Sequence, residues 1–196
     1  MNSEIIWISL TAIASWALVF VTWRMVSKQI KATQEDLHEQ IKVARDGMNQ
    51  QLQMARDDLK VRLQITYEEK FDSPSLILER KKLAKQILAN ATHSEIQDAL
   101  LNFFESIGML LRRGYFDIDM AWSAFSFYSE RWWSATKDYI IEERRRENSD
   151  DTIFEEFELL VNAMYTFEIE KRHLSRAQLE PSKQDLLRFL ENEANL

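Results

Sequence analysis

Apolar and small residues recur every eleven positions along residues 26–66, and this repeat constrains the fold more than any other feature. The segment Gln40–Asp46 returns almost unchanged as Gln51–Asp57. Within each repeat the apolar steps are four, three and four residues, so one repeat completes three helical turns at about 3.67 residues per turn. Because this value is close to the ~3.6 of an α-helix, the apolar residues stay on one side. We therefore predict one long helix that ends near Phe71.

Glycine and proline are scarce, which favours an all-α fold. Three Gly and two Pro among 196 residues leave few positions for the turns and bulges of a sheet. Both prolines, Pro74 and Pro181, stand where a helix can begin. The absence of Cys excludes disulfides and thiol chemistry. A net charge of −7 argues against nucleic acid as a partner, because phosphates require a basic protein face.

An uncharged segment of nineteen residues lies between Glu4 and Arg24. About 20 apolar residues cross a bilayer as a helix, so the segment is long enough. Trp7 and Trp23 stand near its ends, where indole rings favour the headgroup region. The acidic start and the length of the apolar run argue against a cleaved signal peptide. We therefore expect an uncleaved transmembrane helix at 5–26.

Basic residues follow this segment, and no Lys or Arg precedes it. Arg24, Lys28 and Lys31 come directly after the apolar run. By the positive-inside rule, residues 1–4 would form a short tail outside and the rest of the chain would be cytoplasmic. The prediction is a single-pass protein of the cell inner membrane with a cytoplasmic C-terminus.

The eleven-residue repeat continues from a predicted coiled-coil stalk at 27–72 back into the membrane segment. A lone helix cannot shield such a stripe from water, and copies anchored in one direction would meet side by side. We therefore expect a parallel homo-oligomer. The alternative is a solitary helix that leans on its own domain. A second stripe through Val43 and Met54 indicates either more than two strands or a companion that docks on the stalk. The first stripe, called the seam below, consists of Thr11, Ser15, Thr22, Ile30, Leu37, Ile41, Ala44, Met48, Leu52, Ala55, Leu59 and Leu63.

Four further helices are predicted in a cytoplasmic domain at 73–172, the head. Their expected starts are Ser73-Pro74, Ser94 with Gln97, Asp117, and Thr152 with Glu155. The second of these helices would end at Gly114. Residues 173–196 would form a linker and a short amphipathic helix from Ser182, docked on the head or elsewhere. The expected core residues are Leu76, Leu83, Ile87, Ile96, Leu100, Phe103, Phe104, Ile107, Leu111, Trp122, Phe125, Trp132, Tyr139, Ile153, Phe157, Leu160, Val161 and Met164.

Aromatic and charged runs in the head have structural interpretations that we prefer to ligand sites. The run Phe125–Trp133 is typical of a helical core, and it is long enough that Phe127 or Trp133 should be exposed for a protein contact. The basic run 144–146 is bracketed by acids and is expected to be a solvated helix end. Glu105 is expected to face solvent.

No catalytic, cofactor or metal site is predicted. The pairs Glu35/His38 and Glu170/His173 have the spacing of di-iron ligands in helical bundles, but one lies in the stalk and the other at the end of the head. The sequence offers neither a Ser/His/Asp set nor a Gly-rich phosphate loop. We therefore expect a protein that is not an enzyme.

Residues 76–165 resemble a bacterial family of membrane-tethered helical domains of unknown function. The resemblance rests on LLNFFESIGMLLRRGYFDID, FYSERWWSATKDYIIEERRRE and TIFEEFELL. It implies an all-helical fold and no established activity. Several such proteins accompany phage-defence or stress genes, which adds those processes to the functions considered.

The sequence thus predicts a membrane-anchored oligomeric scaffold or sensor. It would contact the lipid bilayer through 5–26, its own copies through the seam, and an unknown cytoplasmic protein through the heads. The alternative is a membrane effector whose assembled helices form a conducting path, with Thr11, Ser15 and Thr22 facing water. Small polar residues in membrane helices more often serve packing, which favours the scaffold.

Overall fold

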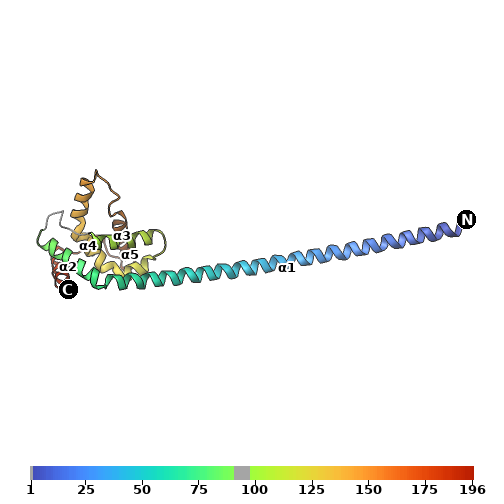
Figure 1. Ribbon diagram of the computed structural model, residues 1–196, viewed down its shortest axis with the longest axis horizontal. Helices are drawn as coiled ribbons and strands as arrows, with labels where there is room; N and C mark the ends of the chain where they lie inside the picture. Colours follow the sequence, from blue (N-terminus) through green and yellow to red (C-terminus); the bar gives the residue numbers. More distant parts are fainter. Residues whose placement is uncertain (1, 91–97) are drawn as a thin grey trace. The chain divides into compact units, whose positions relative to one another are not determined.

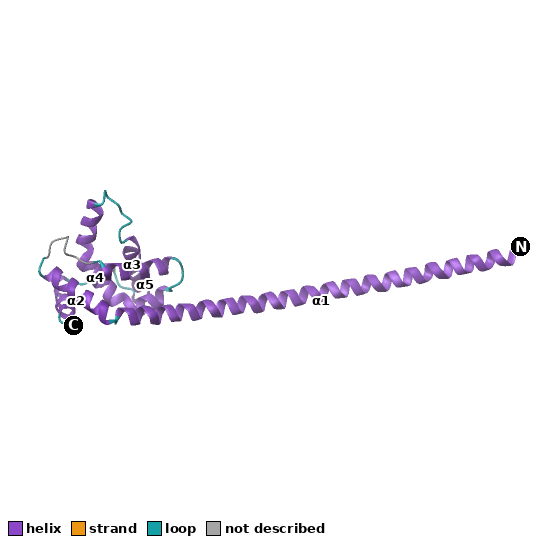
Figure 2. Cartoon of the chain, viewed as in Figure 1, coloured by secondary structure: helices purple, strands orange, loops and turns teal. Residues whose placement is uncertain are grey.

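The computed structural model describes residues 2–90 and 98–196, and for residues 2–15 only the backbone. Within these ranges every regular element is an α-helix, which confirms the predicted all-α fold (Figure 2). The helices are α1 (Asn2–Phe71), α2 (Pro74–Leu88), α3 (Ala99–Arg112), α4 (Ile118–Arg146), α5 (Glu155–Arg172), α6 (Arg176–Leu179) and α7 (Lys183–Ala194).

The first helix, α1, is continuous over 70 residues and ends at Phe71, where the repeat predicted its end (Figure 1). At 1.5 Å per residue it is about 105 Å long. Its contacts divide the chain into two units, one that ends at Ala55 and one that comprises Arg56–Leu196. The C-terminal part of α1 therefore belongs to the second unit.

The membrane segment predicted at 5–26 is not supported by the structure. Among the described residues, no helix contains a stretch that is both long and apolar enough to cross a membrane. Residues 5–15, half of the predicted segment, have side chains that lie outside the described residues. The transmembrane helix thus stays a prediction from the sequence.

The second unit has one hydrophobic core, to which all its long helices contribute. Helix α3 packs against α5, α4 also packs against α5, and α2 packs against α7. Twelve of the expected core residues are buried, while Ile87, Leu111, Trp122, Tyr139 and Ile153 are only partly buried. Ile96 lies outside the described residues. The buried twelve are Leu76, Leu83, Leu100, Phe103, Phe104, Ile107, Phe125, Trp132, Phe157, Leu160, Val161 and Met164.

The close packing of α3 against α5 depends on Gly108. A Cβ atom at this position would collide with the backbone carbonyl of Glu156, the second residue of α5. Beside this contact, the rings of Phe104 and Phe157 stack with centroids 4.9 Å apart. A residue without a side chain therefore sets how near the two helices lie.

Several helix ends follow the expected local rules. Ser73 precedes α2, and its Oγ accepts a hydrogen bond from the Leu76 backbone N–H at 3.3 Å. Gly114 follows α3 with a positive φ of 73°, a conformation that suits glycine after a helix. Ser182 caps α7 by accepting a hydrogen bond from the backbone N–H of Asp185. The Ser94–Gln97 box lies outside the described residues.

Two predicted caps are wrong. Asp117 precedes α4 with an extended backbone but makes no side-chain cap; its carboxylate instead binds the Lys60 ammonium of α1 at 2.8 Å. Helix α5 is preceded by Phe154 in a left-handed conformation rather than by a capping Thr152. The Thr152 hydroxyl donates to the Asp150 carboxylate at 2.7 Å, so its hydrogen bond lies within the loop before α5 and not at the first turn of the helix.

The C-terminal helix docks on the head, which settles the alternative left open by the sequence. Phe189 and Leu190 of α7 are buried, each with 5% of its surface exposed. Between α2 and α7, Arg80 and Glu193 form a two-pronged ion pair with both N···O distances at 2.8 Å. Because both side chains are about nine-tenths buried or more, the pair fixes the position of α7 on α2.

Candidate functional site

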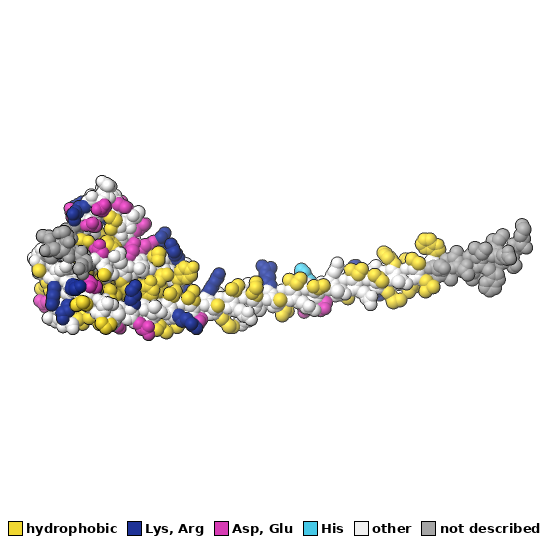
Figure 3. Space-filling view, in the orientation of Figure 1, with side chains coloured by type: hydrophobic (Ala, Val, Ile, Leu, Met, Phe, Trp, Pro, Cys, Tyr) yellow, Lys and Arg dark blue, Asp and Glu magenta, His cyan; other side chains and the backbone are white. Residues whose placement is uncertain are grey.

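The seam on the first unit is bare in the structure. Its large apolar side chains expose about half of their surface, from 51% at Leu52 to 59% at Ile41. Figure 3 shows hydrophobic side chains recurring between polar ones along α1. The second stripe is equally exposed, with Val43 at 66%. Exposed apolar residues at such regular spacing are typical of a helix that packs against another helix.

Thr22 of the seam and Thr33 bond their hydroxyls to the backbone of α1. The Thr22 hydroxyl donates to the Leu18 carbonyl at 2.8 Å, and the Thr33 hydroxyl, which continues the same row, donates to Gln29 at 2.9 Å. Each hydroxyl thus uses its hydrogen inside α1, as threonines in helices commonly do. The side chains of Thr11 and Ser15 lie outside the described residues.

The seam changes character near its C-terminal end, in the second unit. Leu59 is still 44% exposed, whereas Leu63 is partly buried against the core of the head. Beyond it, the Tyr67 ring packs against Phe103 and Phe116, and the Phe71 ring packs against Phe103 and Phe125. The last turns of α1 therefore lean on their own domain, and Leu63 is largely covered by its own chain.

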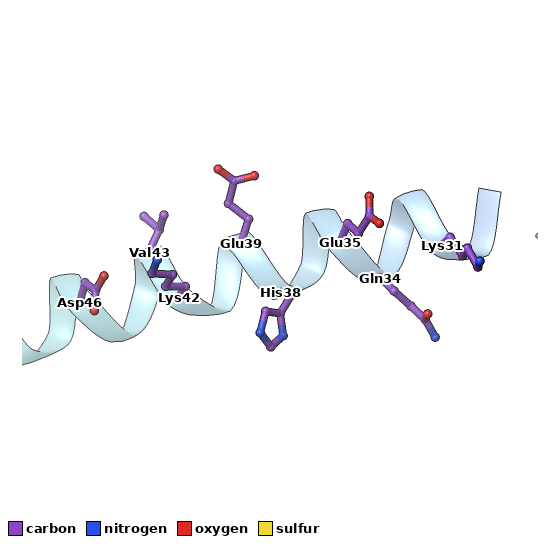
Figure 4. A pocket seen from close by; sticks show the side chains of 8 residues that line it. All are labelled: Lys31, Gln34, Glu35, His38, Glu39, Lys42, Val43 and Asp46. Carbon is purple, nitrogen blue, oxygen red and sulfur yellow. The ribbon is translucent and has the colours of Figure 1, made fainter. Parts of the chain in front are cut away.

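A polar surface between Lys31 and Asp46 includes Glu35 and His38, one of the two pairs whose spacing resembles that of di-iron ligands. Its side chains all come from α1, and Figure 4 shows His38 and Glu39 pointing to opposite sides of the helix. The second pair ends at His173, an exposed residue in a left-handed conformation just after α5. Within the described ranges, no group of three or more potential metal ligands comes together.

Two buried glutamates between α4 and α5 were not predicted. Glu130 and Glu168 expose 6% and 7% of their surfaces. Burial, and after it the nearby Glu168 carboxylate, raise the pKa of Glu130 to about 7. Glu168 accepts a hydrogen bond from the Trp122 indole at 3.3 Å and pairs with Arg172 at 2.9 Å. The only signal in the sequence was the position of Glu130 inside the aromatic run.

The sequence predicted that Glu105 faces solvent, but in the structure its side chain caps the start of α5. Its two carboxylate oxygens accept the backbone N–H groups of Glu156 at 3.3 Å and Phe157 at 2.7 Å. Burial raises the pKa of Glu105, and these two hydrogen bonds oppose that change. The prediction failed because it considered the face of α3 alone, whereas the partner is another helix end, whose free N–H groups attract a carboxylate.

The basic run 144–146 is only partly a solvated helix end. Arg144 has 14% of its side chain exposed; it pairs with Glu158 of α5 at 2.8 Å and donates to the Ile153 carbonyl at 2.9 Å. Arg145 and Arg146 reach only Glu142 and Glu143 of their own helix, at 3.5 and 3.7 Å. One arginine of the run thus ties the end of α4 to the start of α5.

The aromatic run on α4 divides between core and surface. Trp132 and Trp133 are buried, with 0% and 8% exposed, while Phe127 is 53% exposed. The expectation that one of Phe127 and Trp133 lies at the surface is therefore confirmed. Most of the described aromatic side chains of this run thus belong to the core, while Phe127 adds an exposed apolar ring to the surface of the head.

No curated protein and no solved structure matches the chain. A family model described as a domain of unknown function, DUF4760, matches residues 9–164. The match includes most of α1 together with α2, α3, α4 and the first part of α5, and it ends before α6 and α7. It covers well over half of the 196 residues and agrees with the expected helical family of unknown function. This chain belongs to the DUF4760 family.

Proposed function

We propose that the protein is a self-associating scaffold or sensor, anchored in a membrane, that presents helical heads to a protein partner. The observation that carries the proposal is the exposed seam on a helix of 70 residues. In this proposal copies of α1 lie parallel and bury the seam between Ile30 and Leu59. The heads, to which the last turns of α1 already belong, stay free for another contact.

Burial of the seam would supply enough free energy for association. Covering the exposed half of a Leu, Ile or Met side chain contributes on the order of 1 kcal/mol. The seam offers six such large residues per copy, and a shared membrane would raise their effective concentration. These large residues are Ile30, Leu37, Ile41, Met48, Leu52 and Leu59.

The anchor is proposed from the sequence. The nineteen uncharged residues between Glu4 and Arg24, with Lys28 and Lys31 after them, favour a span of the inner membrane with the heads in the cytoplasm. Anchoring in one direction is also what makes a parallel arrangement the natural one. Small polar residues in membrane helices serve packing more often than they line a path, which favours packed anchor helices over a conducting path.

The proposal predicts that Leu52→Asp separates the copies. In a single chain Leu52 is half exposed, so the substitution should leave the head folded, whereas in the assembly it would bury an unpaired carboxylate. Native mass spectrometry of the full chain in detergent should therefore show several copies for the wild type and one for the variant. Gln53→Asp, on a side of α1 that belongs neither to the seam nor to the second stripe, is the matched control and should keep the wild-type subunit number. A single-copy wild type, or an unchanged mass for Leu52→Asp, would refute the seam.

A further inference from the structure

A groove between α4 and α7 lies on the head, outside the seam. It is formed by Phe127, Tyr128 and Arg131 of α4 and by Arg188 and Phe189 of α7, with a volume of about 400 Å³. Residues separated by more than fifty positions in the chain thus share one concave surface. The groove needs no part of α1 before Arg56, because all its lining residues belong to the second unit.

The floor of the groove is buried and electrically balanced. The Arg80–Glu193 ion pair lies there, with side-chain exposures of 5% and 6%. The Arg80 guanidinium also stacks over Phe71 at 4.2 Å and Tyr128 at 5.0 Å from the ring centroids. Because the two charges of the pair neutralise each other, the floor itself attracts neither cations nor anions.

The rim carries a large aromatic ring that is exposed and yet held in place. Phe127 exposes 53% of its surface. The Arg131 guanidinium stacks 3.7 Å from the Phe127 ring centroid and donates a hydrogen bond to the Phe127 carbonyl at 2.9 Å. The Phe127 ring meets Tyr128 edge-on, with centroids 5.2 Å apart. An exposed ring that is already ordered loses little entropy when a partner covers it.

The rim also carries two arginines that form no contact ion pair among the described residues. Within the described part of the chain, Arg131 and Arg188 take part in no ion pair, although most other arginines of the head do. Asp185, which also lines the groove, accepts a hydrogen bond from the Ser182 hydroxyl at 2.6 Å; this bond and the nearby Arg188 and Arg131 guanidiniums lower the pKa of Asp185, so it stays ionised. Two arginines beside one carboxylate leave the rim with an excess of positive charge, in a chain of net charge −7.

We propose that this groove binds an acidic segment of a partner protein, with an apolar side chain on Phe127 and carboxylates on Arg131 and Arg188. Arginine binds carboxylates through two parallel hydrogen bonds, and an apolar anchor beside charged contacts is typical of peptide recognition. The inference rests on the proposed function and names the chemistry of the partner that the heads would hold.

The test is a selection from a displayed library of random peptides against the full chain in detergent, followed by binding measurements with synthetic copies of the selected peptides. The selected sequences should be enriched in Asp and Glu next to a Leu or Phe. Arg131→Gln and Arg188→Gln should each weaken binding by about five- to tenfold, and Phe127→Ala by about tenfold. Arg145→Gln is the matched control, because this exposed arginine at the end of α4 should leave binding unchanged.

Three results would overturn the inference: selected peptides without acidic residues, binding that is insensitive to the Arg131 and Arg188 substitutions, or binding only to vesicles of anionic lipid. Circular dichroism of each variant identifies any that has lost its fold. Native mass spectrometry separates this failure from failure of the seam, because the groove variants should keep the subunit number of the wild type. Peptide binding by a chain that proves to be a single copy would support the groove and refute the seam.

Discussion

Glu130 lies within the aromatic run of α4, and its buried surroundings disfavour the ionised form of its carboxyl group. Burial and the neighbouring Glu168 raise its pKa to about 7, while Arg131 and Arg172 oppose this change. One of its oxygens has no hydrogen-bond partner among the described residues. Between pH 4.5 and about 7 the folded protein therefore keeps neutral a carboxyl group that an unfolded chain would have ionised.

Stability should consequently fall as the pH rises from about 5 to 7. The unfolded chain releases the Glu130 proton near its ordinary value of 4.5, and the folded chain releases it near 7, so the folded state binds more protons between these values. The resulting loss is on the order of 2–3 kcal/mol at most. Glu130→Gln should weaken the dependence of the urea unfolding midpoint on pH in this window. Glu142→Gln, at an exposed carboxyl on the same helix, should leave that dependence unchanged. Parallel profiles for wild type and Glu130→Gln would contradict the assignment.

At the scale of the helices, the bounds that depend on neighbouring residues in the sequence could be predicted. The features that depend on contacts between helices could not. The end of α1 at Phe71, the Ser73 cap and the Gly114 turn depend on neighbours in sequence, and all three were predictable. The start of α5 was not, because its cap is Glu105 from α3. Nor could periodicity reveal the Arg80–Glu193 pair, whose partners are 113 residues apart.

The approach of α3 to α5 makes Gly108→Ala strongly destabilising. Alanine is the better helix former by about 1 kcal/mol, but its methyl group would meet the Glu156 carbonyl, so we expect a net loss of about 2 kcal/mol or more. Chemical denaturation followed by circular dichroism measures this. Gly47→Ala is the control: it lies in α1 with nothing near its Cβ position, so it should be neutral or slightly stabilising. Similar effects of the two substitutions would disprove the close approach.

For the whole molecule, the repeat predicted which apolar residues share one side of α1, and those from Ile30 to Leu59 are exposed in a single copy of the chain. Their burial between copies stays a prediction, because it depends on a second chain. The repeat could not predict that Leu63 is covered, because that depends on where the head folds back onto α1. The basic groove on the head was also missed, since α4 and α7 are separated by the whole of α5.

If the seam joins the copies, association depends more on the side of α1 to which its apolar residues point than on the length of α1. Removing residues 44–54, one full repeat, turns the rest of α1 by only about 20°, so the seam stays aligned. Removing residues 46–54 turns it by about 180° and puts Leu59 opposite Ile41. Native mass spectrometry should show the wild-type subunit number for the first deletion and fewer copies for the second. The same number of subunits for both deletion variants would exclude a continuous seam.

The junction at the end of α1 has a mechanical consequence. Tyr67 and Phe71 belong both to the long helix and to the interior of the head, and the Arg80 guanidinium stacked on Phe71 also holds α7 through Glu193. Tension or torsion applied to this end of α1 would therefore reach the side chains that keep the C-terminal helix in place, without passing through a flexible linker.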